Sequence, residues 1–459
     1  MRNAQRQILA WGIMLLVVTL VACAGGMFML KVLPPIDADR IMRRLPGPVR
    51  QAVASALFPH PDQVPTPAWP PIDPAALLTP LPTRVLPTPT MTIQPSATPT
   101  SLPTEPPVVE PTILPVAEPV SAPANPIGSV TIPTVRAPGP TQAARSTPAS
   151  NEGIDVLITL ARQEYQGWNN CGPATLAMNL SVFGWQGTQY DAAQFLKPDQ
   201  EDKNVSPDQM AAYARAAGFN ALYRVNGTPL LVKTLLRYGL PVLIEKGFEP
   251  EADLGWMGHY ELIVGFNDLK QEFVAMDSYL GPYQSVPYDQ FDKYWRQFNR
   301  TYLVIYTNEY ADIVTQVLGD QLDDATMWAG ALATAQQEAA ANPDDPFAWF
   351  NLGTNYVALN DLLSAAAAYD HARQIGLPWR MTWYQFGWFD AYLGVSRYDD
   401  VLALADATIK VTGNIEEMFY YKGLALKALG NAGGARSQFE LALQRNPNFA
   451  PARQALASL

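Results

Sequence analysis

The sequence predicts an α+β domain at residues 151–308, followed by an all-α repeat domain at residues 309–459. In the first region, capped helical stretches precede several short runs rich in β-branched and aromatic residues, which is the order of a helix-first α+β fold. In the second region, an alanine-rich helical pattern recurs at a fixed spacing. A chain of 459 residues is too long for one hydrophobic core, which agrees with two folded domains plus connecting segments.

Residues 1–31 are predicted to be a membrane anchor or signal segment. Residues 8–30 are uncharged and mostly apolar, and as a helix they would be long enough to cross a hydrocarbon core of about 30 Å. The alternative is a lipoprotein signal, because the sequence LVAC at residues 20–23 resembles a bacterial lipobox and would place a lipid on Cys23. We expect a single-pass anchor with the globular domains outside the cytoplasm, although basic residues flank the run on both sides.

Residues 32–150 are predicted to be a linker rich in proline and threonine. Between Pro59 and Pro148 lie 25 of the 42 prolines of the chain. Proline fixes φ and has no N–H to donate, so this stretch is not expected to form helices or the interior of a sheet. We expect an extended, polyproline-like spacer that holds the folded domains away from the membrane.

Charge and cysteine content exclude several classes of function. The formal net charge is -11, and clustered basic residues of the kind that bind a phosphate backbone are missing, so nucleic acid is not an expected partner. Cys23 and Cys171 are the two cysteines, which leaves neither a disulfide framework nor a cysteine-based zinc cluster. With no metal-ligand pattern and no glycine-rich dinucleotide loop, no cofactor or metal is expected.

Cys171 lies in the segment QGWNNCGPATLAMNLSVFGW, directly before a predicted helix at residues 173–183. The unpaired amides at a helix N-terminus favour the thiolate, which is the form of cysteine that attacks carbonyl groups. Gly172 permits a close approach of the backbone, and Pro173 suits a first helical turn. The alternative interpretation of Cys171 is a small buried residue without chemistry.

Two further helices and four strands are predicted in the same domain. The helices begin after Ser206 and Thr228, each of which precedes a proline at the first helical position. The strands are predicted at residues 241–246, 259–266, 272–278 and 301–307. Asn267 and Asp268 lie between the second and third strands and predict a hairpin there.

Few residues of this domain could supply the remaining parts of a thiol hydrolase site. Such a site needs a base near the sulfur, a group that orients the base, and donors for the developing oxyanion. His259 begins a predicted strand and is the one histidine of this domain, and Asp277 ends the strand that would pair with it. Gln166 and the backbone amide of Cys171 are the predicted oxyanion donors, with Gln163 as the reserve.

Each of these residues also has an interpretation without catalysis. His259 could be a buried histidine of the core, Asp277 could cap a turn, and Gln166 could be a surface residue. The aromatic residues Trp168, Trp256 and Tyr260 are assigned to packing and are left out of the site.

The segments QGWNNCGPATLAM, GHYELIVGF and FVAMDSY resemble the Cys, His and Asp motifs of the C39-like, papain-like peptidase families. The resemblance implies a papain-like fold in which Cys171 is the nucleophile and His259 is the general base and then the general acid. It further implies that Asp277 orients the histidine and that Gln166 contributes to the oxyanion hole. Gln166 departs from the pattern, because it lies one position closer to the cysteine than its counterpart in many members of these families.

The C-terminal region repeats with an offset of 70 residues, which places Gly353 over Gly423 and Tyr369 over Phe439. A middle copy follows at about half this offset. The pattern resembles tetratricopeptide repeats, which stack helix pairs into an array. We expect either a surface for a protein partner or a structural support for the hydrolase.

Together these features predict a membrane-tethered thiol hydrolase that cleaves peptide or amide bonds in a peptide or protein substrate. One alternative is an acyl transferase of the same fold, in which an amine replaces water. Another is a non-catalytic surface scaffold whose repeats bind a protein partner. A peptide exporter is not expected, because the chain has no GxxxxGK[ST] loop and one apolar run.

Overall fold

The computed structural model describes residues 156–250 and 254–459, with Val49, residues 52–53, 63–67 and 74–78, and Trp69. The apolar run at residues 8–30, on which the membrane prediction depends, lies outside the described residues. No helix within the described part of the chain combines the length and the hydropathy needed to cross a membrane.

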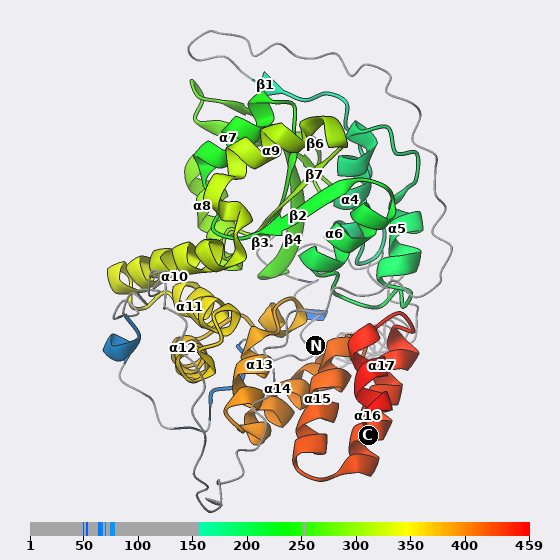
Figure 1. Ribbon diagram of the computed structural model, residues 1–459, viewed down its shortest axis with the longest axis vertical. Helices are drawn as coiled ribbons and strands as arrows, with labels where there is room; N and C mark the ends of the chain where they lie inside the picture. Colours follow the sequence, from blue (N-terminus) through cyan, green and yellow to red (C-terminus); the bar gives the residue numbers. More distant parts are fainter. Residues whose placement is uncertain are drawn as a thin grey trace, which may run out of the picture.

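The first folded unit extends from β1 to β7 and is an α+β domain (Figure 1). Its helices are α4 (Cys171–Val182), α5 (Gln189–Leu196), α6 (Pro207–Ala216), α7 (Pro229–Arg237), α8 (Tyr288–Trp295) and the short η2 (Arg296–Phe298). Its strands are β1 (Val156–Leu157), β2 (Asn220–Arg224), β3 (Val242–Phe248), β4 (Met257–Asn267), β5 (Glu272–Asp277), β6 (Gly281–Pro287) and β7 (Tyr302–Tyr306).

The strands form one antiparallel sheet in the order β2-β7-β3-β4-β5-β6, and β1 pairs with β4. The four predicted strands correspond to β3, β4, β5 and β7. Strand β4 is central, because it pairs with β1, β3 and β5. The prediction missed β1, β2 and β6, which are short or largely exposed and therefore lack a run of apolar residues.

Local signals set the ends of α6, α7 and the β4–β5 hairpin as predicted. Ser206 and Gln209 form a capping box at the start of α6, and the Thr228 side chain accepts from the Leu231 amide at 3.1 Å. Asn267 pairs with Glu272 across the hairpin. This pairing places Asp277 opposite Glu261, two residues beyond His259 on β4.

The second unit is helical and begins after β7. Its helices are α9 (Ala311–Leu318), α10 (Asp324–Ala341), α11 (Pro346–Ala358), α12 (Leu362–Ile375), α13 (Gly387–Gly394), α14 (Tyr398–Val411), α15 (Glu416–Ala428), α16 (Ala432–Arg445) and α17 (Ala450–Ala457). Short turns of 3-10 helix, η3 (Asn308–Tyr310), η4 (Gly319–Leu322) and η5 (Trp379–Trp383), connect them. Helix α15 begins 70 residues after α11 (416 and 346) and ends 70 residues after it (428 and 358), so the offset found in the sequence is also the offset of the helices.

Glycine is required at the same place in two of the helix pairs. A Cβ on Gly353 of α11 would overlap the ring of Tyr369 on α12, and a Cβ on Gly423 of α15 would overlap the ring of Phe439 on α16. The aligned residues of the two sequence copies therefore make the same contact, in which an aromatic ring of the second helix packs on bare backbone of the first.

Part of the proline-rich segment packs on the helical unit. Val64 and Leu77 are buried in the core of that unit. The Val64 amide donates to the Leu377 carbonyl at 3.0 Å, and the Tyr356 hydroxyl donates to the Leu77 carbonyl at 2.8 Å. Residues 63–67 and 74–78 therefore do not form a free spacer. The second of these stretches is the 3-10 turn η1 (Pro74–Leu78), which packs against α10 and α12.

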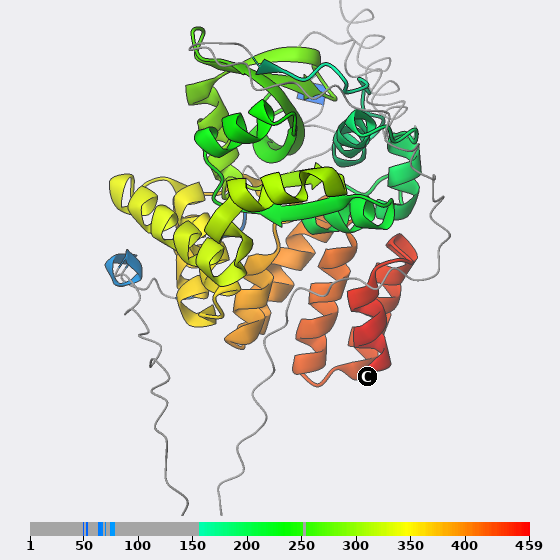
Figure 2. The same cartoon turned by 45° about the horizontal axis from the view of Figure 1, so that its top comes forward.

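The two units meet along the connections between successive helix pairs (Figures 1 and 2). Four such connections contact the first unit, and each contributes a polar contact. The contacts are Asp345 with Arg296 at 2.8 Å, Arg380 with the Leu254 carbonyl at 2.7 Å, Asn414 with Asp199 at 3.1 Å, and Asn448 with the Phe195 carbonyl at 3.2 Å. Trp256 and Phe298 of the first unit also belong to the hydrophobic core of the second. These contacts favour the structural-support alternative for the repeats.

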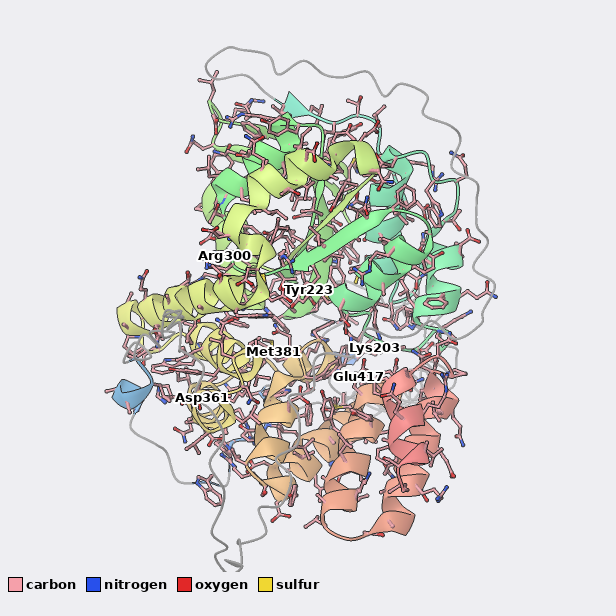
Figure 3. All side chains as sticks on the ribbon, viewed as in Figure 1. Lys203, Tyr223, Arg300, Asp361, Met381 and Glu417 are labelled. Atoms are coloured by element: carbon pink, nitrogen blue, oxygen red, sulfur yellow. The ribbon has the colours of Figure 1, made fainter. Side chains whose placement is uncertain are left out.

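Three carboxyl groups are buried together in this interface, in the region where Figure 3 shows Lys203 and Glu417. Asp202 lies between α5 and α6, and Glu416 and Glu417 are the first residues of α15. The carboxyl groups of Asp202 and Glu416 are close enough to interact, and burial raises the pKa of Glu416. Burial and mutual repulsion raise the pKa of Asp202 and of Glu417 well above the ordinary range, with Lys197 partly opposing this at Asp202.

The interface is therefore expected to weaken as the pH rises. Carboxyl groups in an unfolded chain titrate near pH 4, so groups with a raised pKa take up protons on folding, and the free energy of unfolding falls with increasing pH above about 4. In thermal melts between pH 5 and pH 8, the Tm of wild type should fall as the pH rises, and the Tm of Glu417→Gln should fall less steeply. The exposed Glu440→Gln is the matched control, and the same slope in wild type and both variants would contradict the assignment.

Replacing Gly423 with alanine is expected to destabilise the helical unit by about 1–3 kcal/mol, the usual range for overpacking. The reason is that the new methyl group would overlap the Phe439 ring. Gly433→Ala in α16 is the control, because a Cβ there would have nothing within 4 Å, and alanine should then stabilise the helix by up to about 1 kcal/mol. Thermal unfolding of both variants measures the difference, and a Tm change of the same sign at both sites would be inconsistent with the close contact.

Candidate active site

The structure brings three of the predicted site residues together. Cys171 is the first residue of α4, His259 lies near the start of β4, and Asp277 ends β5. His259 Nε2 lies 3.0 Å from Asp277 Oδ2, and the Cys171 side chain is a further hydrogen-bonding partner of the same imidazole. The imidazole is therefore held between a thiol and a carboxylate, which is the order needed for a base that is oriented by an acid.

Asp277 is fixed and charged. Its side chain is fully buried, and its Oδ1 accepts from the amides of Tyr279 at 2.6 Å and Leu280 at 2.8 Å. Burial alone would raise the pKa of Asp277, but the charge and hydrogen bond of His259 and the two amides lower it below the ordinary range. The carboxylate is thus ionised at neutral pH and can stabilise an imidazolium.

His259 is held in its charged form by the same contacts. Burial lowers its pKa, but the charge of Asp277, the hydrogen bond to it and the contact with Cys171 raise the pKa to about 10. The ring of Phe248 stacks on the imidazole at a centroid distance of 4.3 Å. This stacking covers one face of the ring and limits its rotation, so the two nitrogen atoms keep their separate partners.

Gln166, the predicted oxyanion donor, is tied to the residue after Asp277. Its backbone amide donates to the Ser278 carbonyl at 2.8 Å, and its side-chain Oε1 accepts from the Ser278 hydroxyl at 2.9 Å. Among the hydrogen bonds of the described residues, none joins its side chain to Cys171. The reserve residue Gln163 donates to the Asp277 carbonyl at 2.8 Å and so supports the hairpin end.

Gln189 is a residue that the sequence reasoning missed. It is buried at the start of α5, and its Oε1 accepts from the Gly167 amide at 2.6 Å and from Asn170 Nδ2 at 3.3 Å. Its Nε2 donates to the Tyr165 carbonyl at 2.8 Å. One side chain therefore holds three points of the loop that leads into Cys171, and no sequence pattern marks this role.

Glu245 is a second residue that was missed, because it lies within an apolar strand sequence. It is buried on β3 opposite Tyr260, and its Oε1 has no hydrogen-bond partner. The Tyr260 hydroxyl donates its one hydrogen to the Val205 carbonyl at 2.7 Å and is also in contact with Glu245. Burial raises the pKa of Glu245 well above its usual range, and the contact with Tyr260 partly opposes this.

Residues 157–303 match the model of the Peptidase_C39 like family, and this segment is a C39-like domain. Among solved structures, one described as a C39-like peptidase from Bacillus anthracis is 14% identical, with a TM-score of 0.29, and the alignment covers 34% of this chain and 98% of that chain. A structure of MamA is 15% identical, with a TM-score of 0.26, and is matched over 32% of this chain and 80% of its own. The comparison with curated proteins gives no match.

The described residues include no group of three or more His, Cys, Asp or Glu side chains that could hold a metal ion.

Glu245→Gln is expected to leave the rate of Cys171 alkylation at pH 7 within about twofold of wild type. Burial raises the pKa of this carboxyl group well above its usual range, so a neutral amide in its place should change the charge beside the thiol very little. If Glu245 were instead charged beside the thiol, its removal would favour the thiolate, and a tenfold faster reaction would correspond to about one pKa unit. The exposed Glu249→Gln is the control for a change of net charge alone.

Proposed function

We propose that the C39-like domain is a thiol hydrolase that cleaves peptide or amide bonds, with Cys171 as nucleophile, His259 as base and acid, and Asp277 as the orienting carboxylate. The observation that carries the proposal is the buried His259 imidazole, whose Nε2 lies 3.0 Å from Asp277 Oδ2 and which has the Cys171 side chain as a second partner. A buried pair of His and Asp costs free energy unless its members satisfy each other, and such groups cluster at functional sites.

In the proposed reaction, the Cys171 thiolate attacks the carbonyl carbon of the substrate, and a C–S bond forms. The negative charge moves to the carbonyl oxygen, where backbone amides at the N-terminus of α4 can donate to it. The C–N bond then breaks, and the His259 imidazolium gives its proton to the leaving amine. Water attacks the thioester while His259 accepts its proton, the C–S bond breaks, and the products are a carboxylic acid, an amine and the free enzyme.

The position of the folded body relative to a membrane is part of the same proposal. If residues 8–30 anchor the chain, the tether consists of residues 31–62, because Val64 already packs on the helical unit. At about 3.3 Å per extended residue, this tether reaches at most about 100 Å. We place the hydrolase outside the cytoplasm within this distance, with a peptide or protein as substrate and with protein partners on those surfaces of the repeats that the first unit leaves free.

The test is hydrolysis of a mixture of peptides by the full chain, read by mass spectrometry. Wild type is expected to produce cleavage products, and Cys171→Ala and His259→Ala are expected to lose at least about a thousandfold in rate, as triad substitutions do. Asp277→Asn should retain the fold but react more slowly because the imidazole loses its orientation. Wild-type cleavage that survives Cys171→Ala would overturn the proposal, and so would a folded wild type that cleaves nothing, which would leave the scaffold alternative.

A further inference from the structure

The connection between α12 and α13 reaches from the helical unit to the strand that carries His259. Figure 3 shows Met381 of η5 at the boundary between the two units. Arg380 anchors this connection, because its Nη1 donates to the carbonyls of Leu254 at 2.7 Å and Trp256 at 3.0 Å. Both carbonyls lie within five residues of His259 along the chain. Tyr384, directly after η5, is therefore held against the start of β4.

The ring of Tyr384 occupies a space that a glycine leaves open. A Cβ on Gly258 would lie 2.9 Å from the Tyr384 ring, closer than any ordinary contact. Gly258 pairs with Gly247 on β3, so two bare backbone positions lie side by side there. Trp256 meets the Tyr384 ring edge-on at a centroid distance of 6.0 Å, and the two rings form an aromatic wall at the start of β4.

The hydroxyl of Tyr384 has a hydrogen left to donate. The Gly258 amide, Cys171 and Glu245 all lie close enough to the hydroxyl to affect its pKa, which burial raises. Among the described residues, no hydrogen bond uses the hydroxyl hydrogen of Tyr384. Tyr384 and Cys171 are both half-buried, so neither residue is closed off from solvent.

We propose that Tyr384 is a substrate-contacting residue that the helical unit supplies to the C39-like domain, and that its hydroxyl donates a hydrogen bond to a backbone carbonyl of a peptide bound over Cys171. This inference rests on the proposed function. The ligand is a peptide backbone because the contact offers one neutral donor beside an aromatic wall, and an uncharged acceptor suits it better than an ionic group. The helical unit is then a part of the active site as well as its support.

The test compares two electrophiles on the full chain at one pH. Iodoacetamide reports the reactivity of Cys171, whereas an epoxysuccinyl peptide must also occupy the positions around it. Tyr384→Phe keeps the ring and removes the hydroxyl, so the iodoacetamide rate should stay within about twofold, and inactivation by the epoxysuccinyl peptide should slow by about tenfold, the effect of one lost hydrogen bond of about 1.4 kcal/mol. Tyr398→Phe, whose hydroxyl donates to Ser396 in the same unit, should change neither rate.

Each outcome decides one of the two proposals. If wild type reacts with both electrophiles and Tyr384→Phe matches it, the hydroxyl has no role with the peptide and the inference is wrong, while the proposed function stands. If the variant slows both reactions equally, Tyr384 acts on the thiol or on the fold, and the inference is again wrong. If wild-type Cys171 reacts with neither electrophile, the proposed function fails and the inference falls with it.

Discussion

The register of strand β4 is the constraint on which the rest of the structure depends. β4 pairs with β1, β3 and β5, and the Thr175 hydroxyl of α4 donates to the Tyr260 carbonyl at 3.1 Å. The helix that begins with Cys171 is therefore tied to the strand that carries His259. Since side chains alternate along a strand, a shift by one residue would turn His259 away from both of its partners. The same shift would put a side chain where Gly258 now receives Tyr384.

The helical unit is joined to the loop before Cys171 through a continuous set of contacts. The connection between α5 and α6 contacts α15 and α16 through Asp202 and Asp199. The same connection contacts the loop before Cys171, where Trp168 donates to Glu201 at 3.0 Å. These contacts are buried or partly buried, and they connect the surroundings of Cys171 with the helical unit. We infer from them that the helical unit both supports the C39-like domain and completes its candidate site.

Sequence reasoning succeeded where the signal is local. The caps at Ser206 and Thr228 and the β4–β5 hairpin follow from neighbouring residues, and α4 begins at Cys171, two residues before the predicted start. The 70-residue offset of the helices follows from the similarity of the two sequence copies. The proximity of Cys171, His259 and Asp277 followed from the hairpin together with the family resemblance. The role of Gln166 in an oxyanion hole stays a prediction. Tyr384, Gln189 and Val64 were missed because their partners lie far away in the chain or in a loop, where no periodicity marks them.

The central claim is that His259 and Cys171 act as a pair, and the pH dependence of Cys171 alkylation tests it most directly. The measurement is the rate of reaction with iodoacetamide from pH 5 to pH 10 in wild type and in His259→Ala. A free cysteine reacts mainly above its pKa of about 8.5. We expect the rate for wild type to be nearly constant from mildly acid pH upwards. The rate for His259→Ala should depend on pH as it does for a free thiol. Two identical profiles of an ordinary thiol would contradict the claim.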